Sequence, residues 1–207
     1  VISGLVPPDT GSIRFAGREL ASATPERISE AGLVRTFQVA RGFPKLSVFQ
    51  HLMLYGRDQP GESLWQAIVG TKAAREREAA LAERAWETAR FLKLDHLIDN
   101  PATALSGGQK KLLEIGRALM AEPRLVLLDE PTAGVNPTLQ NEIGERLLEL
   151  PKRGITVLLI EHDMGFIARL CNPVIVMAEG QVLTQGTFDE VRNDHRVREA
   201  YLGRRAA

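Results

Sequence analysis

The sequence predicts an α/β fold with a parallel sheet at its core and an inserted helical subdomain. Two apolar runs, 125–128 and 155–160, have the length and composition of buried parallel strands. The segment 137–153 between them is helical in pattern, and a strand, a helix and a strand of this length form a crossover unit. The third observation is the segment 72–94, which is rich in Ala, Glu and Arg and contains neither Gly nor Pro.

Composition places the chain among ordinary globular proteins. We expect residues 1–207 to form a single domain with a helical insertion at 57–104. Lys and Arg total 26, as do Asp and Glu, so the net charge is zero and no nucleic-acid partner is expected. The single Cys171 excludes an internal disulfide. The longest apolar run is far shorter than the ~20 residues that cross a membrane.

Short strands and helices alternate at the start of the chain. A strand is predicted within 11–17, between two glycines, and a helix begins after Thr24, which is a good N-cap. The next strand, 33–38, gives way to a loop at Gln38. A short helix is expected within 45–55.

Helical and hairpin patterns account for most of the remaining chain. Within 72–94 an apolar stripe recurs at helical spacing, at Leu81, Ala85, Ala89 and Leu92. The segments 173–177 and 181–185 predict a hairpin, and 188–201 predicts a helix.

The most distinctive local feature is Leu105-Ser-Gly-Gly-Gln109, which directly precedes an amphipathic helix. Ser106 can cap that helix, and the two glycines allow a ligand to approach the backbone closely. The free N–H groups of a helix N-terminus attract phosphate oxygens. Taken alone, the same residues are also explained by an ordinary helix cap.

Polar residues follow the two predicted parallel strands. Asp129 and Glu130 end the first strand, at the edge of the sheet where ligands bind in open α/β folds. A carboxylate there suits Mg²⁺, and a neighbouring Glu can deprotonate water. His162 ends the next strand and can hydrogen-bond a terminal phosphate. Each residue alone, and Gln38 likewise, is equally consistent with an ordinary loop position.

Taken in order, these motifs resemble those of the ATP-binding-cassette (ABC) ATPases, which have a P-loop NTPase-like fold. The resemblance covers essentially the whole chain. Gln38 matches the Q-loop, 105–109 the signature motif, 125–130 Walker B, 134–137 the D-loop and His162 the switch histidine.

The resemblance implies an ATPase that uses ATP and Mg²⁺. It assigns Glu130 as general base, Asp129 and Gln38 as Mg²⁺ ligands, and His162 as a contact of the γ-phosphate. It also implies that a nucleotide held by a second subunit is contacted by Ser106, Gly107, Gly108, Gln109 and Asn136. Asn136 stands where many cassettes have Asp.

Four segments are similar to the ATP-binding subunits of branched-chain amino acid importers. They are Val34-Arg-Thr-Phe-Gln38, Gly134-Val-Asn-Pro137, Ile160-Glu-His-Asp-Met164 and Ala200-Tyr-Leu-Gly203. This similarity implies a peripheral protein at the cytoplasmic face of the inner membrane. It also implies four kinds of partner or substrate: a second identical or paralogous ABC ATPase subunit, two integral membrane permeases, a periplasmic binding protein, and an imported solute. Related systems carry urea, amides or aromatic acids.

The P-loop of the family, Gly-x-x-x-x-Gly-Lys-Ser/Thr, does not occur in the 207 residues. We therefore expect the N-terminal strands and the P-loop to be absent, through either an unrecorded segment or a truncated gene product. On that expectation the chain as written does not hydrolyse ATP unaided, since the P-loop supplies most of the charge for phosphoryl transfer. Two alternatives remain: a soluble ABC ATPase without a permease, and a truncated cassette without catalysis.

Overall fold

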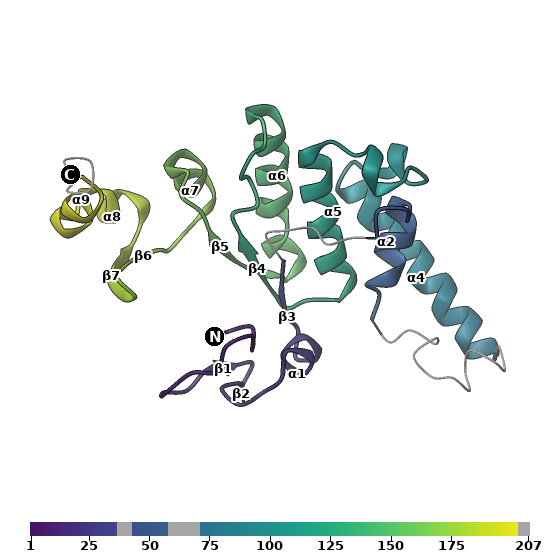
Figure 1. Ribbon diagram of the computed structural model, residues 1–207, viewed down its shortest axis with the longest axis horizontal. Helices are drawn as coiled ribbons and strands as arrows, with labels where there is room; N and C mark the ends of the chain where they lie inside the picture. The colour runs from purple at the N-terminus through teal and green to yellow at the C-terminus, as the bar shows by residue number, and fades with distance from the viewer. Residues whose placement is uncertain (37–42, 58–70, 203–207) are drawn as a thin grey trace. The chain divides into compact units, whose positions relative to one another are not determined.

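The computed structural model describes residues 1–36, 43–57 and 71–202, so Gln38 lies outside the described residues. It separates into two units, Val1–Ile160 and Glu161–Ala207 (Figure 1). The first unit contains a parallel sheet and most of the helices, and the second contains a hairpin with three helices. A single domain with an insertion at 57–104 stays a prediction.

A three-stranded parallel sheet forms the centre of the first unit, as the sequence predicts. Its order is β3 (Leu33–Arg35), β4 (Leu125–Asp129) and β5 (Thr156–Ile160). Val126 of the middle strand is completely buried. The helix α6 (Pro137–Glu149) lies between β4 and β5 in the chain. Because β4 and β5 are neighbours and parallel, both leave the sheet at the same edge.

The prediction of a buried strand at 155–160 is wrong in its burial. Leu158 of β5 is 36% exposed and Ile160 is 51% exposed. In the described part of the sheet β5 is an edge strand that pairs only with β4, so its side chains are covered less than those of the central strand.

The first residues form a hairpin where a single strand was predicted. Its strands are β1 (Arg14–Phe15) and β2 (Arg18–Glu19), which pair antiparallel. The turn between them has positive φ at Ala16 and at Gly17, 51° and 78°. Two successive left-handed residues are the geometry of a tight hairpin turn, and the sequence Ala-Gly is an uncommon signal for it.

The first helix, α1 (Pro25–Glu30), begins where the sequence predicts. The Thr24 hydroxyl caps it by accepting a hydrogen bond from the Arg27 N–H, and Pro25 occupies the first turn. A small core beneath this helix consists of Leu20, Ile28 and Leu33.

Three helices pack together in the first unit (Figure 1). They are α2 (Val48–Leu54), α4 (Lys72–Phe91) and α5 (Gly107–Met120). Short 3-10 turns, η2 (Asp95–Leu97) and η3 (Ala102–Ala104), connect α4 to α5. The predicted stripe faces this contact and is buried, at Leu81, Ala85, Ala89 and Leu92.

The helix predicted over 137–153 divides into α6 and a 3-10 turn, η4 (Pro151–Arg153). Pro151 supplies no N–H, so the α-helical hydrogen-bond pattern ends before it. Gly154 then takes a left-handed conformation, with φ of 79°, and stops the helix.

The second unit contains the predicted hairpin, β6 (Val174–Ala178) and β7 (Gln181–Gly186). The helix α7 (Met164–Leu170) precedes it. The helix predicted over 188–201 divides into α8 (Phe188–Asn193) and α9 (His195–Leu202). Asp194 separates them, because its backbone is extended and its carboxylate accepts the Arg196 N–H at 2.9 Å. Among the described helices there is none with the length and hydropathy of a membrane span.

Candidate functional site

The acidic pair lies at the edge where β4 and β5 end. Asp129 is the last residue of β4 and Glu130 follows it. The Glu130 N–H donates to the Ile160 carbonyl oxygen at 2.9 Å, so the two strands stay hydrogen-bonded up to the point where they leave the sheet. His162 follows the end of β5 by two residues in the chain and belongs to the second unit.

Glu130 has a left-handed backbone conformation, with φ of 46°. A residue with a Cβ atom is uncommon there, and such strain costs about 1–3 kcal/mol. The backbone turns sharply after it, since the Ala133 N–H donates to the Glu130 carbonyl at 3.2 Å. Strained residues are concentrated at functional sites, so this geometry favours a role for Glu130 beyond ending a strand.

Arg35 is a site residue that the sequence analysis did not single out. Its Nη2 atom lies 3.0 Å from Oδ2 of Asp129, and the side chains are 30% and 20% exposed. Its Nη1 atom also donates to the Ser3 hydroxyl at 3.4 Å. A usable signal was present, because Arg35 is a charged residue in a short apolar strand that ends just before Gln38.

The chemistry of Asp129 suits Mg²⁺. Magnesium is commonly held by one or two carboxylates, with water and phosphate oxygens completing its shell. Asp129 provides one carboxylate at the sheet edge, and its Oδ2 atom is the one that contacts Arg35. The described residues contain no cluster of three or more His, Cys, Asp or Glu that could enclose a metal. The site therefore fits a cation bound mainly through a phosphorylated ligand.

The signature segment forms a reciprocal helix cap. Ser106 Oγ accepts the Gln109 N–H at 3.3 Å, and Gln109 Oε1 accepts the Ser106 N–H at 2.8 Å. Ser106 and Gly107 are exposed, whereas the Gln109 side chain is turned back to the cap. The exposed cap places the N-terminus of α5 at the surface, where its N–H groups can reach an anion.

Gly108 is buried, unlike Gly107. A Cβ atom at Gly108 would overlap Leu139 Cδ2 and would lie 3.2 Å from Val135 Cγ1. Gly107 has space around it, since a Cβ there would meet nothing within 4 Å. Packing against α6 is therefore enough to explain a glycine at position 108, and its contact with a nucleotide stays a prediction.

Asn136 has a local role at the start of α6. It is exposed, and its Oδ1 atom accepts the Leu139 N–H at 3.0 Å, which caps the helix. Asn and Asp are about equally good in this position, so the Asn found here keeps the turn intact. Its contact with a nucleotide across a dimer also stays a prediction.

The His162 ring is open to solvent, with a side chain that is 74% exposed. The ring Nδ1 atom lies 3.7 Å from Oε2 of Glu161, and the His162 backbone N–H donates to the same oxygen at 3.1 Å. The Glu161 side chain is only 1% exposed, so the histidine is tethered to a buried carboxylate.

The Cys171 thiol is half-buried. Burial, and secondarily the Glu161 charge, raise the pKa of this thiol.

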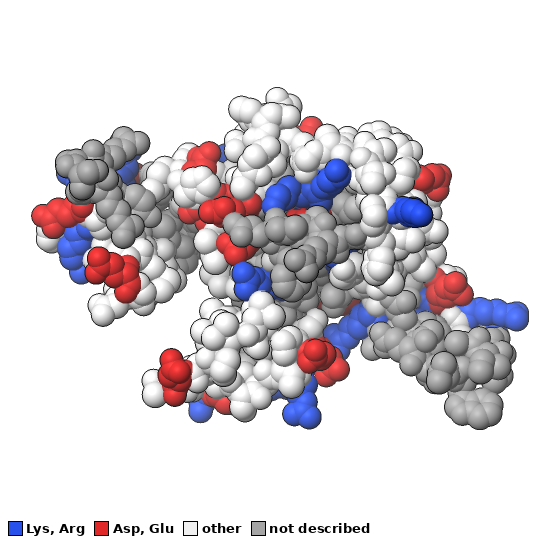
Figure 2. All heavy atoms as spheres, in the orientation of Figure 1, with Lys and Arg blue, Asp and Glu red and all other residues white. Residues whose placement is uncertain are grey.

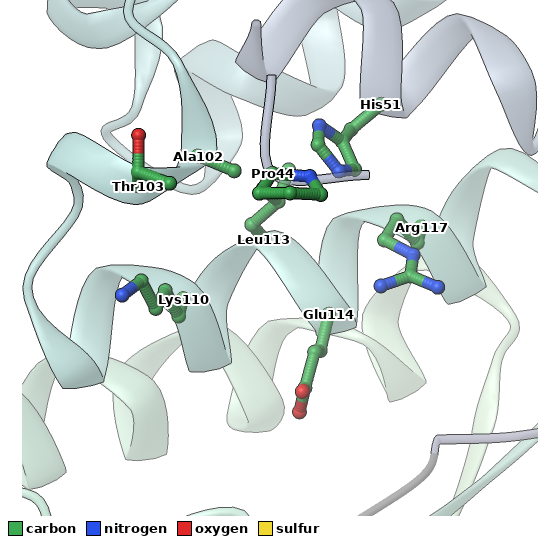
Figure 3. Close-up of a pocket in the computed structure, with 8 residues that line it drawn as sticks. All are labelled: Pro44, His51, Ala102, Thr103, Lys110, Leu113, Glu114 and Arg117. Carbon is green, nitrogen blue, oxygen red and sulfur yellow. The ribbon is translucent and has the colours of Figure 1, made fainter. Parts of the chain in front are cut away.

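A pocket of about 180 Å³ lies between α2, η3 and α5, and its residues were not predicted from sequence. Figure 3 shows the His51 ring directed from α2 toward Pro44 and Leu113. His51 is 1% exposed, and its Nδ1 atom bonds the Ser47 carbonyl at 3.0 Å. Nε2 of the same ring is buried and has no partner in the described ranges. Glu114 also lines the pocket, and burial raises its pKa.

Acidic and basic side chains are interspersed over the face shown in Figure 2. This mixture agrees with the equal numbers of the two charges, 26 each. The first unit also contains ion pairs between segments distant in the chain, such as Arg84 of α4 with Glu122, which follows α5, at 2.9 Å.

Two family models match the chain. The ABC transporter family matches residues 1–133, and the branched-chain amino acid ATP-binding cassette transporter family matches residues 181–207. Two archaeal relatives, both named "Probable branched-chain amino acid transport ATP-binding protein LivG", are similar over most of their length. The Archaeoglobus fulgidus protein is 38% identical over 98% of this chain and 77% of its own. The Methanocaldococcus jannaschii protein is 38% identical over 98% and 80%.

Solved structures show the same fold. A nucleotide-free ATP-binding cassette from an ABC transporter aligns with a TM-score of 0.81 at 36% identity, over 97% of this chain and 80% of its own. An ATP-binding cassette in its ADP conformation aligns with a TM-score of 0.81 at 37% identity, over 98% and 81%.

Proposed function

Because this chain belongs to the ABC transporter family, whose members hydrolyse ATP, we propose that it is the ATP-hydrolysing subunit of an importer for branched-chain amino acids. The substrate class is supported by the match over residues 181–207 and by the names of the relatives. The geometry that supports the reaction lies at the edge of the parallel sheet.

The observation that carries the proposal is the acidic pair at the end of β4. Asp129 is fixed by the sheet, and Glu130 follows it in a strained left-handed conformation. A carboxylate beside the site of phosphate binding can orient and deprotonate the attacking water. We assign Glu130 this role. Mg²⁺, when bound, would be held by Asp129 and Gln38 and would neutralise charge on the phosphates.

The remaining assignments concern the phosphate itself and a second subunit. His162 would stabilise the γ-phosphate with its exposed ring. The exposed cap at Ser106 and Gly107 would meet a nucleotide held by a second, identical or paralogous subunit, together with Gly108, Gln109 and Asn136. An outward helix N-terminus supports this arrangement, because it presents N–H groups to an anion.

Transport needs further partners. We propose two integral membrane permeases and, indirectly, a periplasmic binding protein, with this subunit peripheral at the cytoplasmic face of the inner membrane. The helical segment 57–104 would carry closure to the permeases. The names of the relatives, which are transport ATP-binding proteins, support this placement.

Glu130→Gln in the full-length protein tests the catalytic assignment. We expect nucleotide binding to persist while ATP turnover falls by about 10²-fold or more, the range for loss of a general base. Glu179→Gln is the matched control, since Glu179 also has a left-handed backbone, with φ of 50°, but lies in the β6–β7 turn. Unchanged hydrolysis in the Glu130 variant would contradict the assignment.

Co-purification tests the transport assignment. The protein, tagged and extracted from membranes with detergent, should retain a polytopic membrane protein. Cells without the gene should lose uptake of leucine, isoleucine and valine. Recovery of the protein only from the soluble fraction, with uptake intact, would instead favour an ABC ATPase that works without a permease.

A further inference from the structure

The Arg35–Asp129 pair joins two of the strands at the candidate site. We propose that Arg35 is a positioning residue: its guanidinium holds the Asp129 carboxylate until a divalent cation takes it, and it weakens cation binding there. This inference rests on the proposed function, because it gives Asp129 the role of cation ligand. It concerns a residue that the family resemblance does not assign.

Strand register brings the two side chains to one face of the sheet. Arg35 is paired with Leu127 in the parallel ladder between β3 and β4. Asp129 is two residues further along β4, and side chains two apart in a strand point to the same face. The Nη2–Oδ2 distance of 3.0 Å follows from this diagonal placement.

The Arg35–Asp129 pair is shielded from solvent enough for the attraction between the two charges to be significant. The Arg35 and Asp129 side chains are 30% and 20% exposed, so water screens their attraction less than at an open surface. Without the guanidinium, the carboxylate would keep a largely buried charge with one fewer partner. In the absence of a metal, the arginine is therefore the charged partner that contacts the Asp129 carboxylate.

Among the described residues, few contacts hold the guanidinium. It reaches Asp129 at 3.0 Å and Ser3 at 3.4 Å, the second of which is long for a hydrogen bond. Its Nε atom is buried and has no partner within the part of the chain that the structure describes. An arginine can donate five hydrogen bonds, so this one can move without losing a complete network.

A cation and a guanidinium compete for the same oxygen atoms. Both are positively charged, so each raises the free energy of the other beside Asp129. Linkage requires the effect to be reciprocal: if Arg35 weakens cation binding, then the cation weakens the Arg35–Asp129 contact by the same factor.

The test measures Mn²⁺ binding to the full-length protein with saturating ADP, by electron paramagnetic resonance. We expect Arg35→Met to bind Mn²⁺ about tenfold more tightly than the unchanged protein, a factor typical of one charge–charge coupling. Arg35→Lys keeps the charge and should stay within about twofold. Asp129→Asn should abolish the gain when combined with Arg35→Met.

Arg124→Met is the matched control. Arg124 directly precedes β4 at the opposite end of the strand, where its side chain lies over the Phe15 ring at 5.9 Å. Arg124→Met removes one positive charge from the same unit, but that charge is not beside Asp129. Mn²⁺ affinity should therefore not change. Mn²⁺ binding in Arg35→Met that is equal to or weaker than in the unchanged protein overturns the proposal.

A second measurement needs no variant that might fold poorly. In the unchanged protein, Mg²⁺ should shift the Nε–H resonance of Arg35, and Mn²⁺ should broaden it, with the assignment taken from Arg35→Lys. An Arg35 resonance that does not respond while the cation binds overturns the proposal. Neither experiment uses ATP hydrolysis. A protein that lacks ATPase activity would therefore contradict the proposed function. The cation-binding data would still decide whether Arg35 weakens cation binding at Asp129.

Discussion

Gly108 lies so close to Leu139 that a Cβ atom at position 108 would overlap Leu139 Cδ2. The Leu139 side chain of α6 therefore packs directly against the backbone of α5 at this glycine. The adjacent Gly107 has no such neighbour, since a Cβ there would meet nothing within 4 Å. Packing therefore explains a glycine at position 108, whereas the fold leaves room for a side chain at position 107.

Alanine at each glycine tests this difference. Gly108→Ala should lower the free energy of unfolding by about 1–3 kcal/mol, because overpacking forces the two helices apart. Gly107→Ala should leave stability unchanged or raise it by up to ~1 kcal/mol, because alanine favours the helix. Urea unfolding measures both. Equal losses in the two variants would show that the contact with Leu139 does not limit the packing.

The cap of α5 can be tested against a second cap of the same design. Ser106 and Ser47 each form a reciprocal cap, with Gln109 and Gln50 respectively. Replacing either serine with alanine should lower the free energy of unfolding by about 1 kcal/mol, since each loses one side-chain acceptor. Thermal unfolding measures this loss.

Only one of the two caps belongs to the proposed site. Ser106→Ala should also reduce ATP turnover, whereas Ser47→Ala should reduce stability alone. A turnover loss of the same size in both variants would mean that the effect comes from general destabilisation.

Local rules predicted those parts of the fold that depend on neighbouring residues. The caps at Thr24 and Ser106 are found where the sequence places them. Each depends on one side chain or one backbone conformation within four residues. The apolar stripe of α4 was equally predictable from the sequence, because helical periodicity identifies the buried face directly.

Contacts between distant segments could not be predicted from local sequence in the same way. Arg35 and Asp129 are 94 positions apart, and their contact depends on the register of β3 and β4. The clash that Leu139 would impose on residue 108 depends on how α5 and α6 pack. The exposure of Leu158 depends on the place of β5 at the edge of the described sheet, which the strand's own composition does not reveal.

The left-handed conformation of Glu130 predicts a stability effect opposite to its effect on activity. Glu130→Gly should raise the free energy of unfolding by about 1 kcal/mol, because glycine has no Cβ atom to strain at φ of 46°. Turnover should be lost with the carboxylate. Glu179→Gly, at φ of 50°, should give a similar gain in stability and keep turnover. A stability loss confined to the Glu130 variant would show that its side chain also supports the fold.

Glu114 predicts the direction of a pH effect. Its side chain is 11% exposed, and burial raises its pKa above the usual 4.5, although Lys111 at 3.8 Å opposes the shift. Between 4.5 and the raised pKa, the folded state binds more protons than the unfolded state, so stability falls as pH rises through this window. Glu114→Gln cannot ionise, so it should be more stable than the unchanged protein at neutral pH, with the difference vanishing below pH 4.5. Urea unfolding at a series of pH values from acid to neutral measures this. A difference that is constant with pH would mean that packing or the Lys111 contact, and not the buried charge, sets the stability of this position.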